Sequence, residues 1–101
     1  MRMIFDVRIP VETFNDAVRD GTAGATLQSI LEAAKPEVAY FTVQQGCRGL
    51  IMVVDLNDPS EIPAYAEPWF LNFEAEVDFR VAMSPEDLGR AGLDELAKQW
   101  G

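Results

Sequence analysis

The sequence contains no histidine. Histidine is the usual base of Ser-His and Cys-His nucleophile pairs, an axial ligand of haem and a frequent ligand of zinc. Its absence excludes haem held through histidine, both nucleophile pairs and most zinc sites. We therefore expect neither a metal nor another cofactor, and a general base in this chain would have to be a carboxylate.

Cysteine occurs once, as Cys47. A single cysteine cannot form an intrachain disulfide, which is typical of proteins from a reducing compartment. The sequence also has no basic and apolar leader and no apolar run long enough to cross a bilayer. We therefore expect a cytoplasmic protein with no membrane partner, and we interpret Cys47 as incidental.

Basic residues are scarce. Eight of them stand against 17 acidic residues, for a formal net charge of −9, and only Lys35 and Lys98 are lysines. Binding to DNA, RNA or an anionic membrane requires cations that displace condensed counterions. We therefore expect no nucleic-acid partner.

What the sequence does contain is enough apolar material for one core. Its 101 residues are 49% hydrophobic and 25% charged, which is ordinary for a soluble globular protein. A chain of this size buries roughly 60–70% of its unfolded surface on folding. We predict a single domain over residues 1–101.

The spacing of apolar residues distinguishes strands, with period two, from helices, with period near 3.6. It predicts strands over 2–9, 38–44, 48–56 and 73–83, a helix over 11–35, a second helix from Pro59, and a helical tail after Ser84. Glycines at 21 and 24 are expected to kink the first helix or bring it close to the sheet. Pro68 is expected to end or bend the second helix, and QQGC provides a hairpin turn.

This order predicts an α+β fold of ferredoxin-like βαββαβ type, with a four-stranded antiparallel sheet, both helices on one face and a short C-terminal helical tail. The strand at 73–83 should pair with the first strand. Ranking the registers by charge favours Arg8 opposite Asp78 and Asp6 opposite Arg80. Val7 would then lie opposite Phe79, and finding Asp6 opposite Asp78 would refute this register.

The sheet face away from the helices should mix apolar and charged side chains. We expect the helices to cover Phe5, Val7, Leu50, Met52, Val54, Val77 and Phe79. The open face should carry Ile4, Asp6, Arg8, Tyr40, Thr42, Ile51, Val53, Asp55, Glu74, Glu76, Asp78 and Arg80. A contiguous apolar patch usually marks a contact, and a second copy of the sheet is its natural cover. We therefore predict a homodimer through the open face.

The βαββαβ order over residues 2–83, together with three stretches of sequence, carries a resemblance to the dimeric α/β-barrel superfamily. The stretches are VRIP before the first helix, PEVAYFT before the hairpin, and AEPWFLNFEAEVDFRVAMSPEDL at the end. The E-P-x-F and M-x-P-E-D-L segments resemble uncharacterised bacterial members, and V-R-I-P-V is similar to a stretch in the muconolactone isomerase family. The resemblance implies two sheets packed face to face and a cavity for a small organic molecule. Several members isomerise, oxygenate or decarboxylate it without a metal or cofactor, and some have no known activity.

The candidate catalytic residues are the carboxylates of Asp6, Glu74 and Glu76, with Asp78 beside them. Acids on alternate residues of a strand lie about 6.6–6.8 Å apart, so they repel one another if water is removed, and burial can tune a carboxylate as a base. The same acids also fit a solvated edge strand that resists aggregation, or ion pairs in an interface.

The candidate ligand-binding residues are Arg8, Tyr40, Trp69 and Arg80. Arginine can clamp a carboxylate with two parallel hydrogen bonds, tyrosine can donate a hydrogen bond, and an aromatic side chain can line an apolar pocket. Arg8 and Arg80 could instead neutralise neighbouring acids, and Tyr40 and Trp69 could serve packing alone.

Two functions follow from these residues. The first is binding of a small organic ligand, with a cofactor-free isomerase-like reaction that uses a carboxylate base. The second is a non-catalytic homo-oligomeric binding or structural protein. An enclosed pocket with an unpaired acid would favour the first. If Asp6, Glu74, Glu76 and Asp78 are all exposed or matched to arginines, the enzyme hypothesis loses its candidate base.

Overall fold

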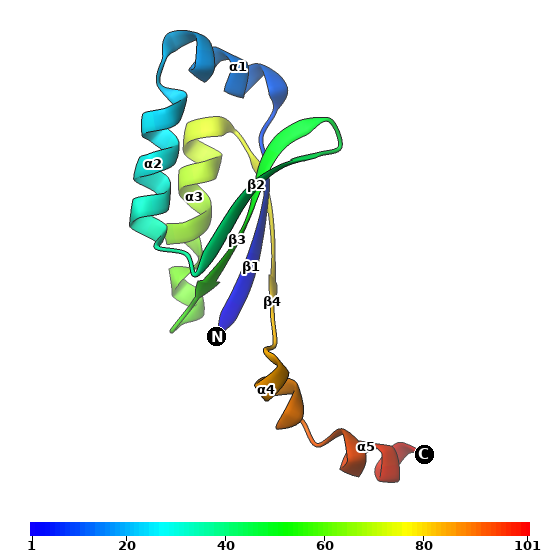
Figure 1. The fold of residues 1–101 in the computed structure, drawn as a ribbon. Helices are drawn as coiled ribbons and strands as arrows, with labels where there is room; N and C mark the ends of the chain where they lie inside the picture. Colours follow the sequence, from blue (N-terminus) through cyan, green and yellow to red (C-terminus); the bar gives the residue numbers. More distant parts are fainter.

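The computed structural model describes residues 1–101 and has an α+β fold (Figure 1). Its strands are β1 (Arg2–Arg8), β2 (Val38–Gln44), β3 (Cys47–Asp55) and β4 (Glu76–Val81). Its helices are α1 (Val11–Asp20), α2 (Ala23–Ala34), the 3₁₀ turn η1 (Pro59–Glu61), α3 (Ile62–Phe73), α4 (Pro85–Gly89) and α5 (Leu93–Trp100). The predicted strand and helix order is therefore confirmed, with the first helix divided in two.

All four strands form one antiparallel sheet in the order β2-β3-β1-β4. Figure 1 shows α1, α2 and α3 together on one side of this sheet. The core between them is made of Met3, Phe5, Val7, Ile9, Ile30, Leu50, Met52, Val54, Leu56, Ala66, Trp69, Phe73 and Ala75. These residues confirm the predicted helix-covered faces of β1 and β3, and they leave the other face of the sheet open.

The break between α1 and α2 lies where the glycines predicted a kink. Gly21 has a φ of 81°, a left-handed conformation that glycine adopts without strain. Thr22 donates from its backbone N–H (2.9 Å) and its hydroxyl (2.6 Å) to the Asp20 carboxylate. These hydrogen bonds, first the one from the hydroxyl, lower the pKa of Asp20. The two helices consequently wrap the sheet as separate segments.

The β2–β3 hairpin closes with a two-residue turn at Gln45 and Gly46. Both residues have positive φ, 50° and 77°, as a type I′ turn requires. Gln44 pairs with Cys47 across the turn. The hairpin predicted from QQGC is confirmed, with its second strand starting one residue earlier than expected.

Pro68 does not end the second helix before Trp69, which was one alternative of the prediction, because α3 continues to Phe73. Three residues on one side of this helix, Ala66, Trp69 and Phe73, are buried against the sheet. The Asn72 side-chain amide also donates to the Pro68 carbonyl at 2.7 Å. Burial of two large aromatic side chains outweighs the loss of one backbone hydrogen bond.

The last strand begins later than predicted. Phe73 is the final residue of α3, Glu74 follows with a φ of 52°, and β4 starts only at Glu76. Phe73 and Ala75 are both buried, so the apolar positions were correct although the conformation was not. Glu74 therefore caps a helix and does not stand on the open face beside Glu76 and Asp78.

The predicted register of β1 and β4 is also wrong. Asp6 lies opposite Asp78, Val7 opposite Val77 and Phe5 opposite Phe79. A shift of two residues keeps the same side chains on each face, so alternation alone does not choose between the two registers. The observed one pairs the Phe5 and Phe79 rings, with centroids 5.6 Å apart, and it places β4 directly after the docked end of α3.

The helices cover β4 only in part, because this strand is an edge of the sheet. Val77 is half-buried, whereas Phe79 is 44% exposed and Val81 is 59% exposed. The prediction that helices would cover Phe79 is therefore wrong. Part of the helix-side surface of β4 remains available for contact.

Residues 84–101, which we call the C-terminal arm, project away from the rest of the molecule (Figure 1). The radius of gyration is 17.1 Å and the longest dimension is 60 Å, whereas a compact chain of this length has a radius of about 13 Å. Neither α4 nor α5 contains a buried residue. No helix of the protein combines the length and apolar composition needed to span a membrane.

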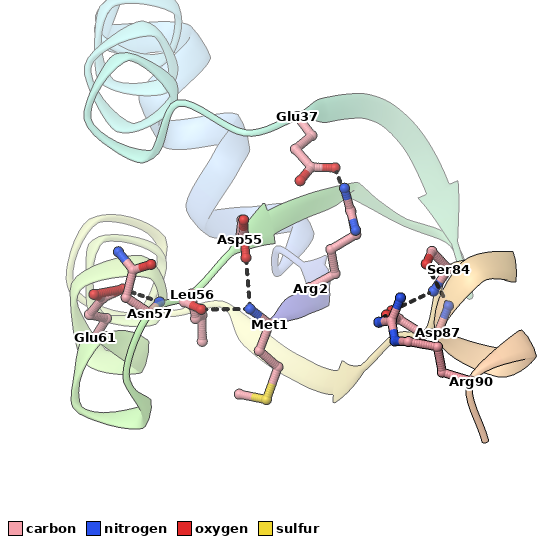
Figure 2. A network of polar contacts seen from close by, with 10 residues as sticks. All are labelled: Met1, Arg2, Glu37, Asp55, Leu56, Asn57, Glu61, Ser84, Asp87 and Arg90. Carbon is pink, nitrogen blue, oxygen red and sulfur yellow. Dashed lines mark hydrogen bonds and ion pairs between the residues drawn. The ribbon is translucent and has the colours of Figure 1, made fainter. Parts of the chain in front are cut away.

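Polar contacts tie the chain together at the end of the sheet where the arm leaves (Figure 2). The Met1 ammonium donates to Asp55 Oδ1 and to the Leu56 carbonyl, both at 2.8 Å, and it lowers the pKa of Asp55. Arg2 Nε donates to Glu37 at 3.1 Å, and this hydrogen bond raises the pKa of Arg2. The starts of β1 and β2 are thereby held beside the end of β3.

The arm itself begins with a capping box. The Ser84 hydroxyl accepts from the Asp87 N–H at 3.1 Å, and the Ser84 N–H donates to the Asp87 carboxylate at 2.9 Å (Figure 2). The hydrogen bond from the Ser84 backbone is the main reason why the pKa of Asp87 is lowered. Arg90 forms an ion pair with the same carboxylate. The predicted helix start at Ser84 is confirmed.

Candidate functional site

A cavity of about 380 Å³, which we call the polar cavity, opens at the hairpin end of the sheet. Its lining comes from the end of β1, the hairpin turn and the connection from α3 to β4, and consists of Arg8, Pro10, Gln45, Cys47, Glu74 and Glu76. This volume is within the range of small-molecule sites. Three of the predicted site residues, Arg8, Glu74 and Glu76, therefore meet in one place.

Arg8 is the central charged group of the polar cavity. Its Nε donates to Glu76 Oε2 at 2.9 Å, a second guanidinium nitrogen contacts the same oxygen, and the third donates to the Gln45 side-chain carbonyl. The hydrogen bond to Glu76 raises the pKa of Arg8. The Arg8 side chain is 31% exposed and that of Glu76 is 67% exposed, so a ligand can reach this ion pair from solvent.

Glu74 lies at the cavity without a partner of its own. It caps α3 in a left-handed conformation, with its N–H donating to the Phe70 carbonyl at 2.9 Å. Its exposed carboxylate takes part in no ion pair or hydrogen bond, unlike that of Glu76. Two carboxylates and one guanidinium give the cavity a net negative charge.

Asp6 does not line the cavity and is held by Gln44. It is half-buried, and its carboxylate accepts from the Gln44 side-chain amide, which reaches it across β3. Gly49 of β3 allows the close approach of β1 nearby, because a Cβ there would lie only 2.2 Å from the Val7 carbonyl oxygen.

The remaining candidate residues lie elsewhere. Tyr40 is 68% exposed on the open face opposite Ile51, and Arg80 is exposed opposite Ile4 without an acidic partner. Trp69 is fully buried in the core, and its indole N–H has no hydrogen-bond partner. None of the three lines the polar cavity.

Sequence reasoning missed two contributors that line the cavity, Gln45 in the hairpin turn and Cys47 directly after it. Cys47 is half-buried. A usable signal was present: in an antiparallel sheet, the end of the first strand and the tip of the central hairpin lie at the same end. That rule brings Arg8 to the turn residues.

The chemistry that this arrangement can perform is set by its acids. Asp6 is bonded to Gln44, Glu76 is bonded to Arg8, and Glu74 and Asp78 are exposed. No three acidic or cysteine side chains gather closely enough to hold a metal ion. The cavity offers hydrogen bonds and one free carboxylate to a polar ligand.

A second depression, which we call the apolar groove, measures about 300 Å³ and lies on the helix side of the hairpin. It is lined by Ile9, Phe14, Phe41, Thr42, Val43, Arg48 and Gly49. The Arg48 guanidinium lies 4.9 Å from the centre of the Phe14 ring and donates to Asn15 at 2.9 Å. No acid pairs with Arg48, and Phe41 and Val43 are 59% and 69% exposed.

Comparison with known proteins adds no assignment, since no family model matches the chain and no curated protein matches it.

Proposed function

We propose that the protein is a ferredoxin-like, dimeric α/β-barrel-type homodimer that binds a small organic ligand in the polar cavity. The strand order β2-β3-β1-β4, with helices after β1 and β3 on one face, supports the split βαβ arrangement. The open face then serves as the dimer interface, as in the superfamily that the sequence resembles.

The single observation that carries the dimer is the composition of the open face. Apolar Ile4, Tyr40, Ile51 and Val53 lie there, and Ile51 is 38% exposed. An exposed surface of this kind usually marks a contact between proteins. A two-fold axis would set the face against itself.

Unmatched charges on the same face fit a self-complementary interface. Five of the eight basic side chains form ion pairs within the chain. Arg80 is among the three that do not, and Asp78, on the same strand, has no partner either. An Arg80–Asp78 pairing between two copies would use both groups and fix the register of the two sheets.

The ligand class follows from the groups in the polar cavity. Because Glu74 is free and the Arg8–Glu76 pair is already closed, a ligand with amine or hydroxyl donors fits better than a second carboxylate. Gln45 adds an amide that can turn to donate or accept. We therefore expect a small neutral or cationic polar molecule.

A second candidate function is a cofactor-free isomerase-type reaction in the same cavity. The observation that favours it is the unpartnered carboxylate of Glu74 at the cavity, but this side chain is exposed, and the enclosed, unpaired acid that would favour an enzyme is absent. Asp6 and Glu76, the other two candidate bases, already hold hydrogen bonds in the described structure. The binding function needs fewer assumptions and is the one we put first.

Ligand binding is tested by thermal shift against matched panels of small amines, polyols and carboxylic acids. We expect stabilisation by an amine or polyol, lost in Arg8→Gln and Glu74→Gln and retained in Arg19→Gln, an exposed position on α1 outside the cavity and the proposed interface. No stabilisation by any panel, or equal loss in all three variants, would contradict the cavity as the site. If a ligand that binds is also chemically converted, and only Glu74→Gln abolishes the conversion, the second function is supported.

The dimer is tested by sedimentation velocity over a dilution series. Ile51→Lys places a charge on the open face and should shift the protein to monomer. Val18→Lys, which alters a similarly exposed apolar residue on α1, should leave the dimer intact. A wild-type chain that sediments as a monomer at every concentration would refute the interface.

A further inference from the structure

The C-terminal arm presents an exposed hydrophobic stripe. Leu93, Leu96 and Trp100 recur at helical spacing along α5, with exposed fractions of 55%, 42% and 80%. Leu88 of α4 is also exposed, at 45%. A stripe of this kind is the face by which a helix packs against another surface.

The helices of the arm are too short to persist without such a surface. α4 has five residues and α5 has eight, whereas isolated helices below about 12–15 residues are marginal in water. The capping box at Ser84 and the Lys98–Glu95 ion pair support single turns only. The arm therefore needs a docking partner to hold the conformation that it has.

We propose that α5 docks in the apolar groove of a second copy of the chain, an inference that rests on the homodimer proposed above. The groove offers the exposed Phe41 and Val43 to the leucines and the tryptophan of the arm. This contact would cover two exposed apolar surfaces at once, the stripe on α5 of one copy and the groove of the other copy.

Charge supports this pairing. Arg48 at the groove is one of three basic side chains that have no acid partner within the chain. The arm carries four acids against two bases, and Asp94 and Glu95 lie next to Leu93 and Leu96. The protein has a net charge of −9. An acidic segment therefore binds most favourably beside a cation that has no acid partner.

The position of the groove favours a second copy over the arm's own chain. The arm follows β4, whose last residue pairs with Met3 at the start of β1, whereas the groove includes Ile9 beyond the end of β1. Six residues of strand separate Met3 from Ile9, a distance of about 20 Å, and β1 and β3 lie between β4 and β2. Figure 1 shows the arm directed away from that end.

The size of the open face gives the arm a role in the dimer. Four strands spaced about 4.8 Å apart make a narrow sheet, while a stable interface buries about 800 Å² on each partner. Docking of the arm of each copy on the other copy adds contact area outside the sheet. The arm would thus lower the dimer dissociation constant.

The experiment follows Trp100 and the association state of the full chain together. The protein has two tryptophans, and Trp69 is fully buried, so acrylamide quenching reports Trp100, with Trp100→Phe as the reference. We expect Trp100 to be shielded at concentrations where sedimentation shows a dimer, and to become quenchable on dilution in step with dissociation.

Two variants then test the docking surfaces. Leu96→Ser in the arm and Phe41→Ser in the groove should each raise the dimer dissociation constant at least tenfold and expose Trp100. Val18→Ser, an exposed apolar residue of α1 outside both surfaces, is the matched control and should change neither.

The other outcomes separate this inference from the dimer. A dimer that Ile51→Lys dissociates, but that Leu96→Ser and Phe41→Ser leave unchanged with Trp100 quenchable, overturns the docking of the arm and keeps the interface. Shielding of Trp100 in the monomer places the arm on its own body and also overturns it. A monomer at all concentrations with Trp100 exposed overturns both proposals.

Discussion

Asp6 and Asp78 lie directly opposite each other on β1 and β4. Like charges across a strand pair are destabilising, and only Asp6 has a compensating partner, in the Gln44 amide. We expect Asp78→Asn to raise the free energy of unfolding by at most about 1 kcal/mol. The measurement is urea denaturation at low salt.

Salt dependence distinguishes this repulsion from an effect of the amide itself. The stabilisation by Asp78→Asn should shrink at high ionic strength, because the two carboxylates are then screened. Glu67→Gln, which neutralises an exposed acid of α3 that has no opposing charge, is the control. If Asp78→Asn lowered the free energy of unfolding of the monomer, the two carboxylates would not repel each other in this register.

Gly49 should be the least replaceable glycine of the protein. An added Cβ would lie 2.2 Å from the Val7 carbonyl oxygen, so Gly49→Ala must move β1 away from β3. We expect a loss of about 1–3 kcal/mol in the free energy of unfolding. Gly24→Ala in α2, where a Cβ meets nothing within 4 Å, should instead gain up to about 1 kcal/mol. Equal effects of the two substitutions in urea melts would contradict the close approach.

Acid should destabilise the fold through its capping carboxylates. The Ser60 hydroxyl and N–H donate to Asp58 and lower its pKa from the ordinary value of 3.8. A carboxyl whose pKa is lower in the folded chain than in the unfolded chain contributes stability above the unfolded value, and that contribution is lost as pH falls through the folded value. We expect thermal stability to fall below about pH 4.

Asp58→Asn isolates the contribution of this cap. Asparagine keeps an accepting oxygen at the start of η1 but does not titrate. The variant should melt slightly below the wild type near pH 7, because it lacks the charge, and should lose less on acidification. If its acid profile coincided with that of the wild type, Asp58 would not be one of the groups responsible.

Trp69 carries a buried N–H with no acceptor, which makes two substitutions informative. Trp69→Ala should cost about 3–5 kcal/mol because it empties the centre of the core. Trp69→Phe should cost much less, since it also removes a polar group whose unsatisfied burial costs about 1–3 kcal/mol. Calorimetric melts of both variants provide the comparison, and equal losses would contradict the prediction.

The local features of the fold could be predicted because each is set by a few neighbouring residues. Gly21 divides the first helix, Gly46 permits the hairpin turn, and Ser84 with Asp87 starts the arm. Period-two alternation correctly indicated which side of β1 and β3 is buried. None of these local features depends on contacts between segments that are distant in the sequence.

The errors arose where tertiary contacts decide. Pro68 stays inside a helix because Trp69 and Phe73 bury their rings on the sheet. The register of β4 follows from that docking, whereas exposed cross-strand charges contribute only about 0.2–1 kcal/mol each. The register is therefore set by apolar burial at the end of α3, and charge pairing, on which the prediction was based, is the weaker effect.

The candidate site could be predicted in part for the same reason. Arg8, Glu74 and Glu76 do gather at one cavity. Tyr40 and Arg80, on the open face, do not join them, because the pairing of strands places them beside Ile51 and Ile4. The contribution of Gln45 and Cys47 was missed although the antiparallel order of the strands brings the end of β1 to the hairpin turn.

The two edges of the sheet differ in one further way. β4 carries the charges of Glu76, Asp78 and Arg80, which discourage another strand from pairing with it. β2, at the other edge, is VAYFTVQ and contains no charge, proline or glycine, the composition of segments that form cross-β stacks. If the protein forms fibrils on concentration, they should grow by strand addition at β2, and the acidic edge should remain free.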